Sequence, residues 1–379
     1  MSGARIVWQE TDGAPREARW LSEAGARPPA RVSVADDTLP ADAAWRLACE
    51  GTALLWRGDY YNARQLLQAM GRRFERSRAR RRQPDDARER FNLYRLDQAQ
   101  RARTLGLLLL PVEPGWRLPL HRAPDVAEAC TAAWGPLDGP AVLSLRELLG
   151  ALGAWQWRLN GVEVPALGAR IHPHYGVFAP VRGEYVDLVA QAPLPPGART
   201  AFDLGTGTGV LAAVLARRGL ERVVATDDSP RALACARDNL ARLGLADRVE
   251  LSADGLYPPG RADLVVCNPP WLPGKAGSTL DRAVYDPDGA MLKGFLEGLA
   301  AHLAPGGEGW LILSDLAERL GLRAPGELEA AFDRAGLVVR DRLQARPRHG
   351  RAADAADPLH AARRDEITSL WRLAPAAGD

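Results

Sequence analysis

The run Asp-Leu-Gly-Thr-Gly-Thr-Gly at residues 203–209 constrains the fold of this chain more than any other feature. The mostly apolar residues 200–204 predict a buried strand before the turn, and the apolar run 210–216 predicts a helix after it. Glycine has no Cβ, so the backbone of such a turn can pass close beneath a ligand while its amides donate from the helix N-terminus. This order of elements is typical of the ligand-binding edge of an open α/β sheet.

The segments around this turn continue the same alternation of strands and helices. Helices separate the early strands, which requires a mostly parallel sheet, whereas no clear helix separates the last two, which predicts one antiparallel strand. The fold class is therefore α/β, with a Rossmann-like, seven-stranded, mostly parallel sheet. The predicted strands are 200–204, 222–226, 249–252, 262–267, 309–313, 337–343 and 367–373, and the predicted helices begin near 210, 231, 291 and 328.

The residues before this sheet predict a second domain, because 379 residues exceed the usual size of a single core. From about 42 to 135, apolar residues recur at steps of three and four, which predicts helices. Residues 155–159 alternate apolar and polar, and Asn160-Gly161 then leads into Val-Glu-Val, which predicts a β-hairpin. We therefore expect a mainly helical N-terminal substrate-recognition domain at 1–165 and the α/β domain at 166–379.

The glycine turn alone fits either S-adenosylmethionine or a nicotinamide dinucleotide. Asp227 ends the next strand about twenty residues later, where a carboxylate can accept both ribose hydroxyls of an adenosine, and both cofactors would use it. Asp203 favours the first cofactor, because a carboxylate beside the glycines repels a pyrophosphate and attracts an ammonium group. Methionine carries such an ammonium group, and NAD does not.

The reactive position is predicted at Asn268-Pro269-Pro270-Trp271, directly after the strand 262–267. The prolines lack amide hydrogens and stiffen the backbone, so this turn offers carbonyl acceptors at the edge where open sheets bind ligands. An acceptor-rich pocket fits a planar NH2 group, such as a carboxamide or the exocyclic amine of a base. Asn268 and the Pro269 carbonyl would accept its two N–H groups, and Trp271 offers a face for stacking.

The sequence resembles the class I S-adenosylmethionine-dependent methyltransferases from about residue 171 to the end, and the run 203–209 matches their first motif position for position. The resemblance implies that Asp203 lies near the methionine ammonium, that Gly205 and Gly207 pass under the cofactor, and that Asp227 binds ribose. It also implies that Asp254 contacts the adenine amine. Thr206, Gly209, Asp228 and Asn268 complete the expected cofactor-binding set.

The turn at 268–271 resembles the Asn-Pro-Pro-aromatic signature of the amino-methylating branch, which includes protein-glutamine, adenine N6 and ribosomal guanine N2 methyltransferases. Trp271 departs from the usual Tyr or Phe, which leaves the identity of the acceptor open. The resemblance implies an N-methyltransferase acting on a protein or RNA of the translation machinery. An NAD-dependent oxidoreductase and a non-catalytic cofactor-binding module remain as alternatives.

Composition adds less than the motifs. The net charge of +2 predicts no strong overall field, but the tract 72–82 holds seven arginines and one glutamate, which makes it a candidate phosphate-contacting face. The other interpretation, which we favour, is a solvated helix surface in an arginine-rich chain. Four scattered cysteines and the absence of a long apolar run predict a cytoplasmic protein with no metal site and no membrane span.

Overall fold

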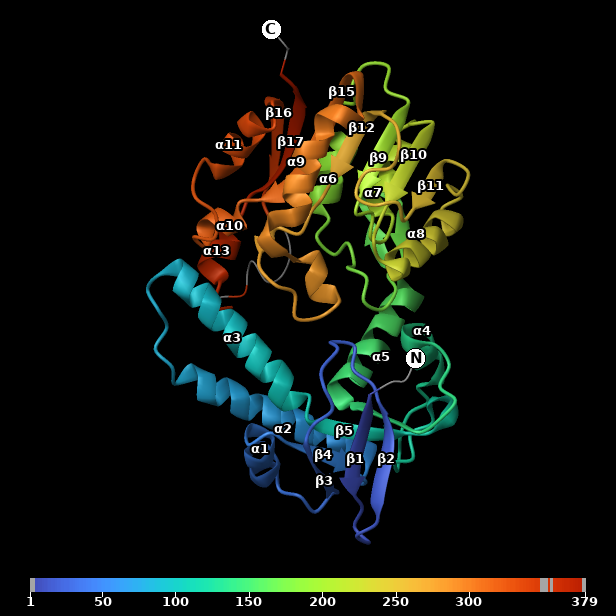
Figure 1. Cartoon of the computed structure of the whole chain (residues 1–379), viewed down its shortest axis with the longest axis vertical. Coiled ribbons are helices and arrows are strands. Elements are labelled where there is room, and N and C mark those ends of the chain that lie inside the picture. Colours follow the sequence, from blue (N-terminus) through green and yellow to red (C-terminus); the bar gives the residue numbers. More distant parts are fainter. Residues whose placement is uncertain (1–3, 348–353, 355–356, 377–379) are drawn as a thin grey trace. The chain divides into compact units, whose positions relative to one another are not determined.

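The computed structural model describes residues 4–347, 354 and 357–376. The chain divides into two compact units, Met1–Asp85 with Asn92–Gln156, and Asp86–Phe91 with Trp157–Asp379. Each unit has its own sheet and its own buried core (Figure 1). Among the described residues, no helix is long and apolar enough to cross a membrane.

The first unit contains a six-stranded mixed sheet in the order β1-β2-β6-β5-β4-β3, so the prediction of a mainly helical region is wrong in missing this sheet. The strands β4, β5 and β6 are short apolar runs, and β5 is buried at all five positions. Such runs lack the alternation that marks a half-buried strand. The elements are β1 (Arg5–Gln9), β2 (Pro15–Trp20), β3 (Arg31–Ala35), α1 (Ala41–Cys49), β4 (Thr52–Trp56), α2 (Tyr60–Ala79), α3 (Ala87–Leu105), β5 (Leu108–Val112), η1 (Pro114–Trp116), α4 (Ala127–Trp134), β6 (Ala141–Ser144) and α5 (Leu145–Asn160).

The hairpin predicted around Asn160-Gly161 is also wrong, because residues 155–160 form the last turns of α5. Gly161 adopts the left-handed conformation with φ of 68° and donates its amide to the Trp157 carbonyl at 2.8 Å, which is how glycine ends a helix. The strand β7 (Val162–Val164) follows, and it pairs with β8 (Ala169–Ile171) across η2 (Pro165–Leu167).

The second unit is built on a seven-stranded sheet in the order β11-β10-β9-β12-β15-β17-β16 (Figure 1). All neighbouring pairs from β11 to β15 are parallel, and β17 runs antiparallel to both β15 and β16, as the sequence predicts. The strands are β9 (Thr200–Leu204), β10 (Arg222–Thr226), β11 (Val249–Ser252), β12 (Ala262–Cys267), β15 (Leu303–Ser314), β16 (Leu337–Ala345) and β17 (Thr368–Pro375).

Helices cover both faces of this sheet. Successive residues of β12 alternate between two buried clusters, Leu264 and Val266 in one, Val265 and Cys267 in the other. The first cluster packs under α6 (Glu184–Gln191), α7 (Val210–Arg217) and α8 (Pro230–Arg242), and the second under α9 (Ala290–His302) and α11 (Glu327–Arg334). The remaining elements are β13 (Leu272–Pro273), η3 (Leu280–Ala283), β14 (Tyr285–Asp286), η4 (Pro287–Gly289), α10 (Leu316–Arg319) and α13 (His360–Arg364).

Candidate functional site

The register of the parallel strands brings the predicted site residues to one edge of the sheet. Leu204, the last residue of β9, is opposite Thr226 of β10 and Cys267 of β12. Gly205, Asp227 and Asn268 therefore leave three adjacent strands at the same level. Ser252 is opposite Thr226 in turn, so Asp254 follows two residues beyond the same edge.

The three glycines of the turn all have left-handed backbones, with φ of 72° at Gly205, 55° at Gly207 and 80° at Gly209. They serve different purposes. A Cβ on Gly209 would approach Ala236 to 3.1 Å, and one on Gly205 would reach 2.5 Å from Met291 Cε, so these two permit close packing. A Cβ on Gly207 would meet nothing within 4 Å, so this glycine faces open space where a ligand can lie against the backbone.

Asp203 is almost completely buried beneath this turn, with 1% of its surface exposed. Its Oδ2 accepts hydrogen bonds from the Thr206 hydroxyl at 2.6 Å and from the Ala212 amide in the first turn of α7 at 3.0 Å. Burial outweighs these two bonds and raises the pKa of Asp203 to about 6. Thr206 thus acts here as a partner that fixes the carboxylate.

Asp227 ties the glycine turn to the end of β10. Its Oδ2 accepts from the Gly207 amide at 2.9 Å, and its Oδ1 accepts from the Ser229 amide at the same distance. Burial raises the pKa of this carboxyl group. The two other predicted acids are exposed: Asp228 pairs with Arg282 at 2.6 Å, and Asp254 accepts from the Ser252 hydroxyl at 3.0 Å.

Asn268 lies directly after β12, and its carboxamide oxygen accepts a hydrogen bond from the Trp271 indole N–H at 2.9 Å. The turn is held in place after Trp271, because Leu272 pairs with Tyr285 of β14 and donates its amide to the Val284 carbonyl at 3.0 Å. Asn268, Pro270 and Trp271 are half-buried, and Pro269 is buried. A turn rich in hydrogen-bond acceptors therefore lies partly exposed at this edge of the sheet.

Sequence reasoning missed Asp286 and Met291, which connect this turn to the glycines. The buried Asp286 carboxylate accepts the backbone amides of Met291 and Leu292 at 3.1 Å, which caps the start of α9. Met291 then lies against Gly205. The Asp-Pro-Asp-Gly run before an apolar helix is a helix-start signal that could have indicated this cap.

Sequence reasoning also left Arg182 without a role. Its guanidinium carbon lies 5.5 Å from the centre of the Trp271 ring, and its Nη1 is 3.1 Å from Oε1 of the fully buried Glu366. The same oxygen accepts from the Ser314 hydroxyl at 2.6 Å. No spacing in the sequence connects residues 182, 271 and 366, so only the fold could reveal this contact.

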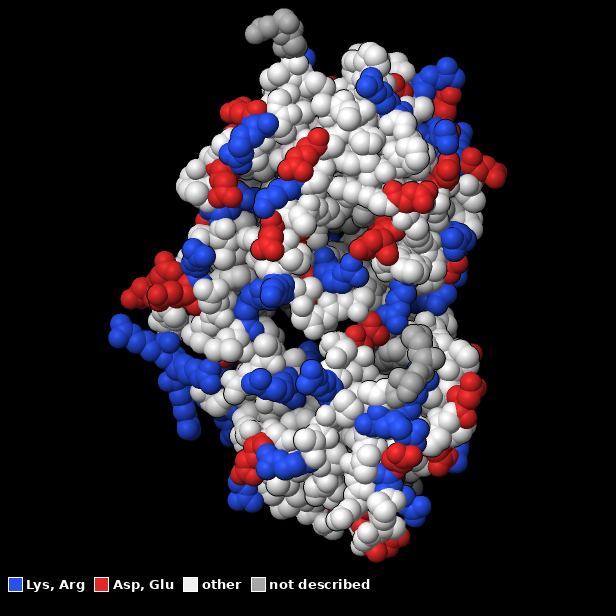
Figure 2. All heavy atoms as spheres, viewed as in Figure 1, with Lys and Arg blue, Asp and Glu red and all other residues white. Residues whose placement is uncertain are grey.

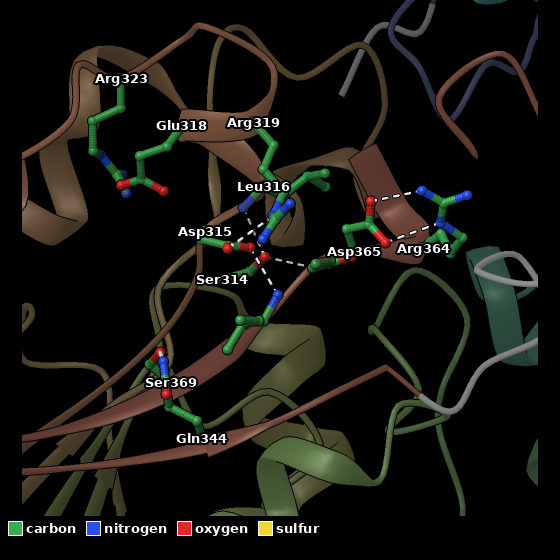
Figure 3. A network of polar contacts seen from close by, with 12 residues as sticks. Ser314, Asp315, Leu316, Glu318, Arg319, Arg323, Gln344, Arg364, Asp365 and Ser369 are labelled. Atoms are coloured by element: carbon green, nitrogen blue, oxygen red, sulfur yellow. Dashed lines mark hydrogen bonds and ion pairs between the residues drawn. The ribbon is translucent and has the colours of Figure 1, made fainter. Parts of the chain in front are cut away.

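A polar network around Ser314 and Asp315 joins the end of β15 to the segment before β17 (Figure 3). Asp315 accepts from the Ile367 amide at 2.7 Å and from Arg319 Nε at 2.8 Å, and the Leu316 amide donates to the Ser314 hydroxyl at 3.0 Å. These bonds fix the segment that carries Glu366 against the end of the sheet.

Two histidines outside this site, which lie two residues apart in the sequence, have hydrogen-bond partners. His172 Nδ1 lies 2.7 Å from the Arg158 carbonyl oxygen, and His174 Nε2 lies 3.0 Å from Asp238 Oδ2. These contacts account for two side chains that could otherwise suggest a metal site.

Part of the arginine tract is paired with acidic side chains, including Arg73 with Asp42 at 2.6 Å. Arg78 and Arg81 pair with the buried Asp97 of α3 at 3.1 and 2.8 Å, and thus hold α2 against α3. Arg80 and Arg82 are exposed. Figure 2 shows basic side chains grouped over the tip of these helices.

Residues 169–342 match the family model described as Methyltransferase small domain. The chain is 37% identical to a release factor glutamine methyltransferase of Cereibacter sphaeroides over 40% of this chain and 58% of that protein. It is 42% identical to the protein of that name in Mycolicibacterium smegmatis, over 33% and 46% of the two chains. With a ribosomal protein L11 methyltransferase of Pelotomaculum thermopropionicum the identity is 37%, over 38% and 39%. The chain thus spans about half the length of the curated relatives it matches.

Proposed function

We propose that this protein, whose residues 169–342 match the methyltransferase small domain, is a class I S-adenosylmethionine-dependent methyltransferase. Its proposed acceptor is the planar NH2 nitrogen of a glutamine-type carboxamide in a protein of the translation machinery. The observation that carries this proposal is the position of Asn268-Pro269-Pro270, one residue beyond β12 and level with the glycine turn. The names of the relatives favour a protein acceptor over the exocyclic amine of an RNA base, which is the second candidate.

The residues at the sheet edge fit the cofactor. The open space over Gly207 leaves room for a ligand against the backbone, and the buried Asp203 offers a carboxylate for an ammonium group. Asp227 and Asp254 follow the two neighbouring strands, where ribose and adenine would be held. Gly209 lets α8 and Gly205 lets α9 pack closely against the turn, which forms this cradle. Asp228 would act only at its rim, since it is exposed and already paired with Arg282.

The acceptor side of the site works by positioning. Bound S-adenosylmethionine supplies a methyl group that its sulfonium already activates. Asn268 Oδ1 and the Pro269 carbonyl would each accept one N–H of the carboxamide, which localises the nitrogen lone pair and orients it. Since a carbonyl oxygen has two lone pairs, the Trp271 N–H leaves Asn268 able to accept a second hydrogen bond. Such preorganised contacts stabilise the charge that develops on the nitrogen.

The N-terminal unit is proposed to select the substrate, and the protein is proposed to act in the cytoplasm, where translation proteins are found. The matched family covers residues 169–342, so the sheet of the first unit lies outside it. A macromolecular substrate needs more contact surface than the edge of one sheet provides. A separate unit that carries its own core can supply that surface.

The test uses a labelled methyl donor, the full chain, and lysate from a strain that lacks the protein, followed by mass spectrometry of the labelled species. A purified release factor and purified ribosomal protein L11 serve as defined substrates. Label on a glutamine amide supports the proposal, and label on an adenine or guanine amine supports the second candidate. Asn268→Ala is the site variant, and Asn92→Ala, at an exposed position of α3, is the matched control. Binding of the cofactor with no methyl transfer to any nitrogen would refute both.

A further inference from the structure

We propose that Trp271 is a positioning residue that aims the Asn268 carboxamide through its indole N–H, and that the Arg182–Glu366 ion pair holds the Trp271 ring for this purpose. The inference rests on the proposed function, since it assigns a task to the residue beside the proposed acceptor pocket. It gives a physical reason for a tryptophan at this place in the turn.

The first step is the hydrogen bond from Trp271 Nε1 to Asn268 Oδ1, at 2.9 Å. An indole N–H can only donate, so it requires the oxygen of the carboxamide on its side and directs the NH2 group of Asn268 away from the ring. The bond fixes the orientation of the Asn268 amide. This orientation decides whether the turn accepts a hydrogen bond from a substrate or donates one to it. Phenylalanine has no hydrogen-bonding group on its ring and cannot do this.

The second step is the restraint on the ring. The Arg182 guanidinium lies over the Trp271 ring, with 5.5 Å from its carbon to the ring centre, within the range of a cation–π contact. Arg182 is itself held by Glu366, which is fully buried and also receives the Ser314 hydroxyl. The ring is therefore anchored by a residue before β9 and a residue before β17.

The third step is what this arrangement leaves for the substrate. One face of the indole is taken by the guanidinium, so a planar acceptor can stack only on the other. The ring is only half-buried and packs partly against both hydrophobic clusters of the sheet, which limits its rotation. The Asn268 oxygen and the free face of the Trp271 ring are therefore both held in position before the acceptor binds.

The activity test compares Trp271→Phe with Trp20→Phe, a partly buried tryptophan of β2 whose indole N–H donates to the Ala26 carbonyl at 2.7 Å. Trp271→Phe should lower kcat about tenfold, the size expected for one lost hydrogen bond. KM and the cofactor Kd should remain within about twofold, because neither cradle nor acceptor oxygen is removed. Trp20→Phe should change none of these values.

A double-mutant cycle separates positioning from a general structural role. In an Asn268→Ala background, Trp271→Phe should have less than a twofold further effect on kcat, because the group that it positions is gone. Independent, multiplying losses would overturn the inference. Removing Arg182 alone would leave Glu366 buried without its cation, so Arg182→Met is combined with Glu366→Gln, and this pair should lower kcat with the cofactor Kd unchanged.

A readout independent of activity is the indole N–H signal of Trp271 in the NMR spectrum of the ¹⁵N-labelled full chain, assigned by its loss in Trp271→Phe. Asn268→Ala should shift this signal and speed its exchange with solvent, and an unshifted signal would overturn the inference. This measurement needs no substrate. If the signal responds but no nitrogen is methylated, the proposed function fails while the Trp271–Asn268 contact stands.

Discussion

Replacement of Asp203 by asparagine tests how the buried carboxylate beneath the glycine turn is used. Burial raises the pKa of Asp203 from 3.8 to about 6, while the unfolded chain keeps the ordinary value. Between pH 7 and pH 5 the folded chain therefore binds more protons at this group than the unfolded chain. The sign follows from linkage: this carboxyl group makes the folded state more stable as the pH falls through 6, and this stabilisation is lost as the pH rises.

The size of the effect follows from the same two pKa values. Going from pH 7 to pH 5, the protonation of Asp203 should stabilise the chain without cofactor by about 1 kcal/mol, which is roughly 2–4 °C in Tm for a unit of this size. Asp203→Asn cannot titrate but keeps an acceptor oxygen for the Thr206 hydroxyl and the Ala212 amide. The increase in Tm between pH 7 and pH 5 should therefore be roughly 2–4 °C smaller for Asp203→Asn than for the natural protein.

The assay is thermal unfolding without cofactor at pH 5, 6 and 7, with the exposed Asp254→Asn as a control that should follow the natural protein. Asp227 also has a pKa raised by burial and is present in both proteins compared, and its charge adds to the raised pKa of Asp203. In parallel, calorimetry should find that the affinity for S-adenosylmethionine falls as the pH drops through about 6, because a protonated Asp203 no longer attracts the ammonium group. Identical pH dependence of Tm and affinity in the natural protein and Asp203→Asn would refute the reasoning.

Three further results are expected. Gly207→Val should abolish cofactor binding in calorimetry while the circular dichroism spectrum is retained. The control is Gly197→Val, at a glycine with φ of 73° and equally open space, which should leave the cofactor affinity unchanged. An equal loss of affinity in both variants would point to backbone strain alone. Asn268→Ala should leave cofactor affinity mostly intact and lower the rate of labelled methyl transfer by roughly two to three orders of magnitude, and an unchanged rate would remove Asn268 from the site. Arg78→Ala and Arg81→Ala should lower Tm through loss of the pairs with Asp97, whereas Arg80→Ala and Arg82→Ala should leave Tm unchanged. If the tract binds phosphates, Arg80→Ala and Arg82→Ala should also lower the salt dependence of binding to a single-stranded RNA, and salt-insensitive binding would favour the solvated face.

The sequence predicts the second unit well because its signals are local and repeated. The strand boundaries at 200–204, 222–226, 249–252 and 262–267 agree with β9 to β12, since each strand is followed by a turn signal: the glycine turn after β9, Asp227 after β10, Asp254-Gly255 shortly after β11 and Asn268-Pro269 after β12. The parallel order then brings Asp203, Asp227 and Asn268 together without further information.

The first unit shows where local signals are ambiguous. The run Leu-Leu-Leu-Pro-Val at 108–112 is buried throughout, and a short apolar run of this kind fits a buried strand or a helix equally well. The Asn160-Gly161 pair fits a hairpin turn or a helix end, and the distinction depends on the helix that precedes it. The contact between Arg182, Trp271 and Glu366 depends on three distant segments, so no local pattern contains it.

The position of β17 in the sheet determines when the second unit can finish folding during synthesis. β15 and β16 precede β17 along the chain, yet β17 lies between them and pairs with both. During synthesis, β15 and β16 emerge from the ribosome first and do not pair with each other. The sheet can be completed only when residues 368–375 emerge and pair with both strands. Glu366 emerges just before them, so the anchor of Arg182 is among the last contacts to form. A nascent chain with a finished glycine turn would therefore still lack the contacts that hold Trp271 beside the proposed acceptor pocket.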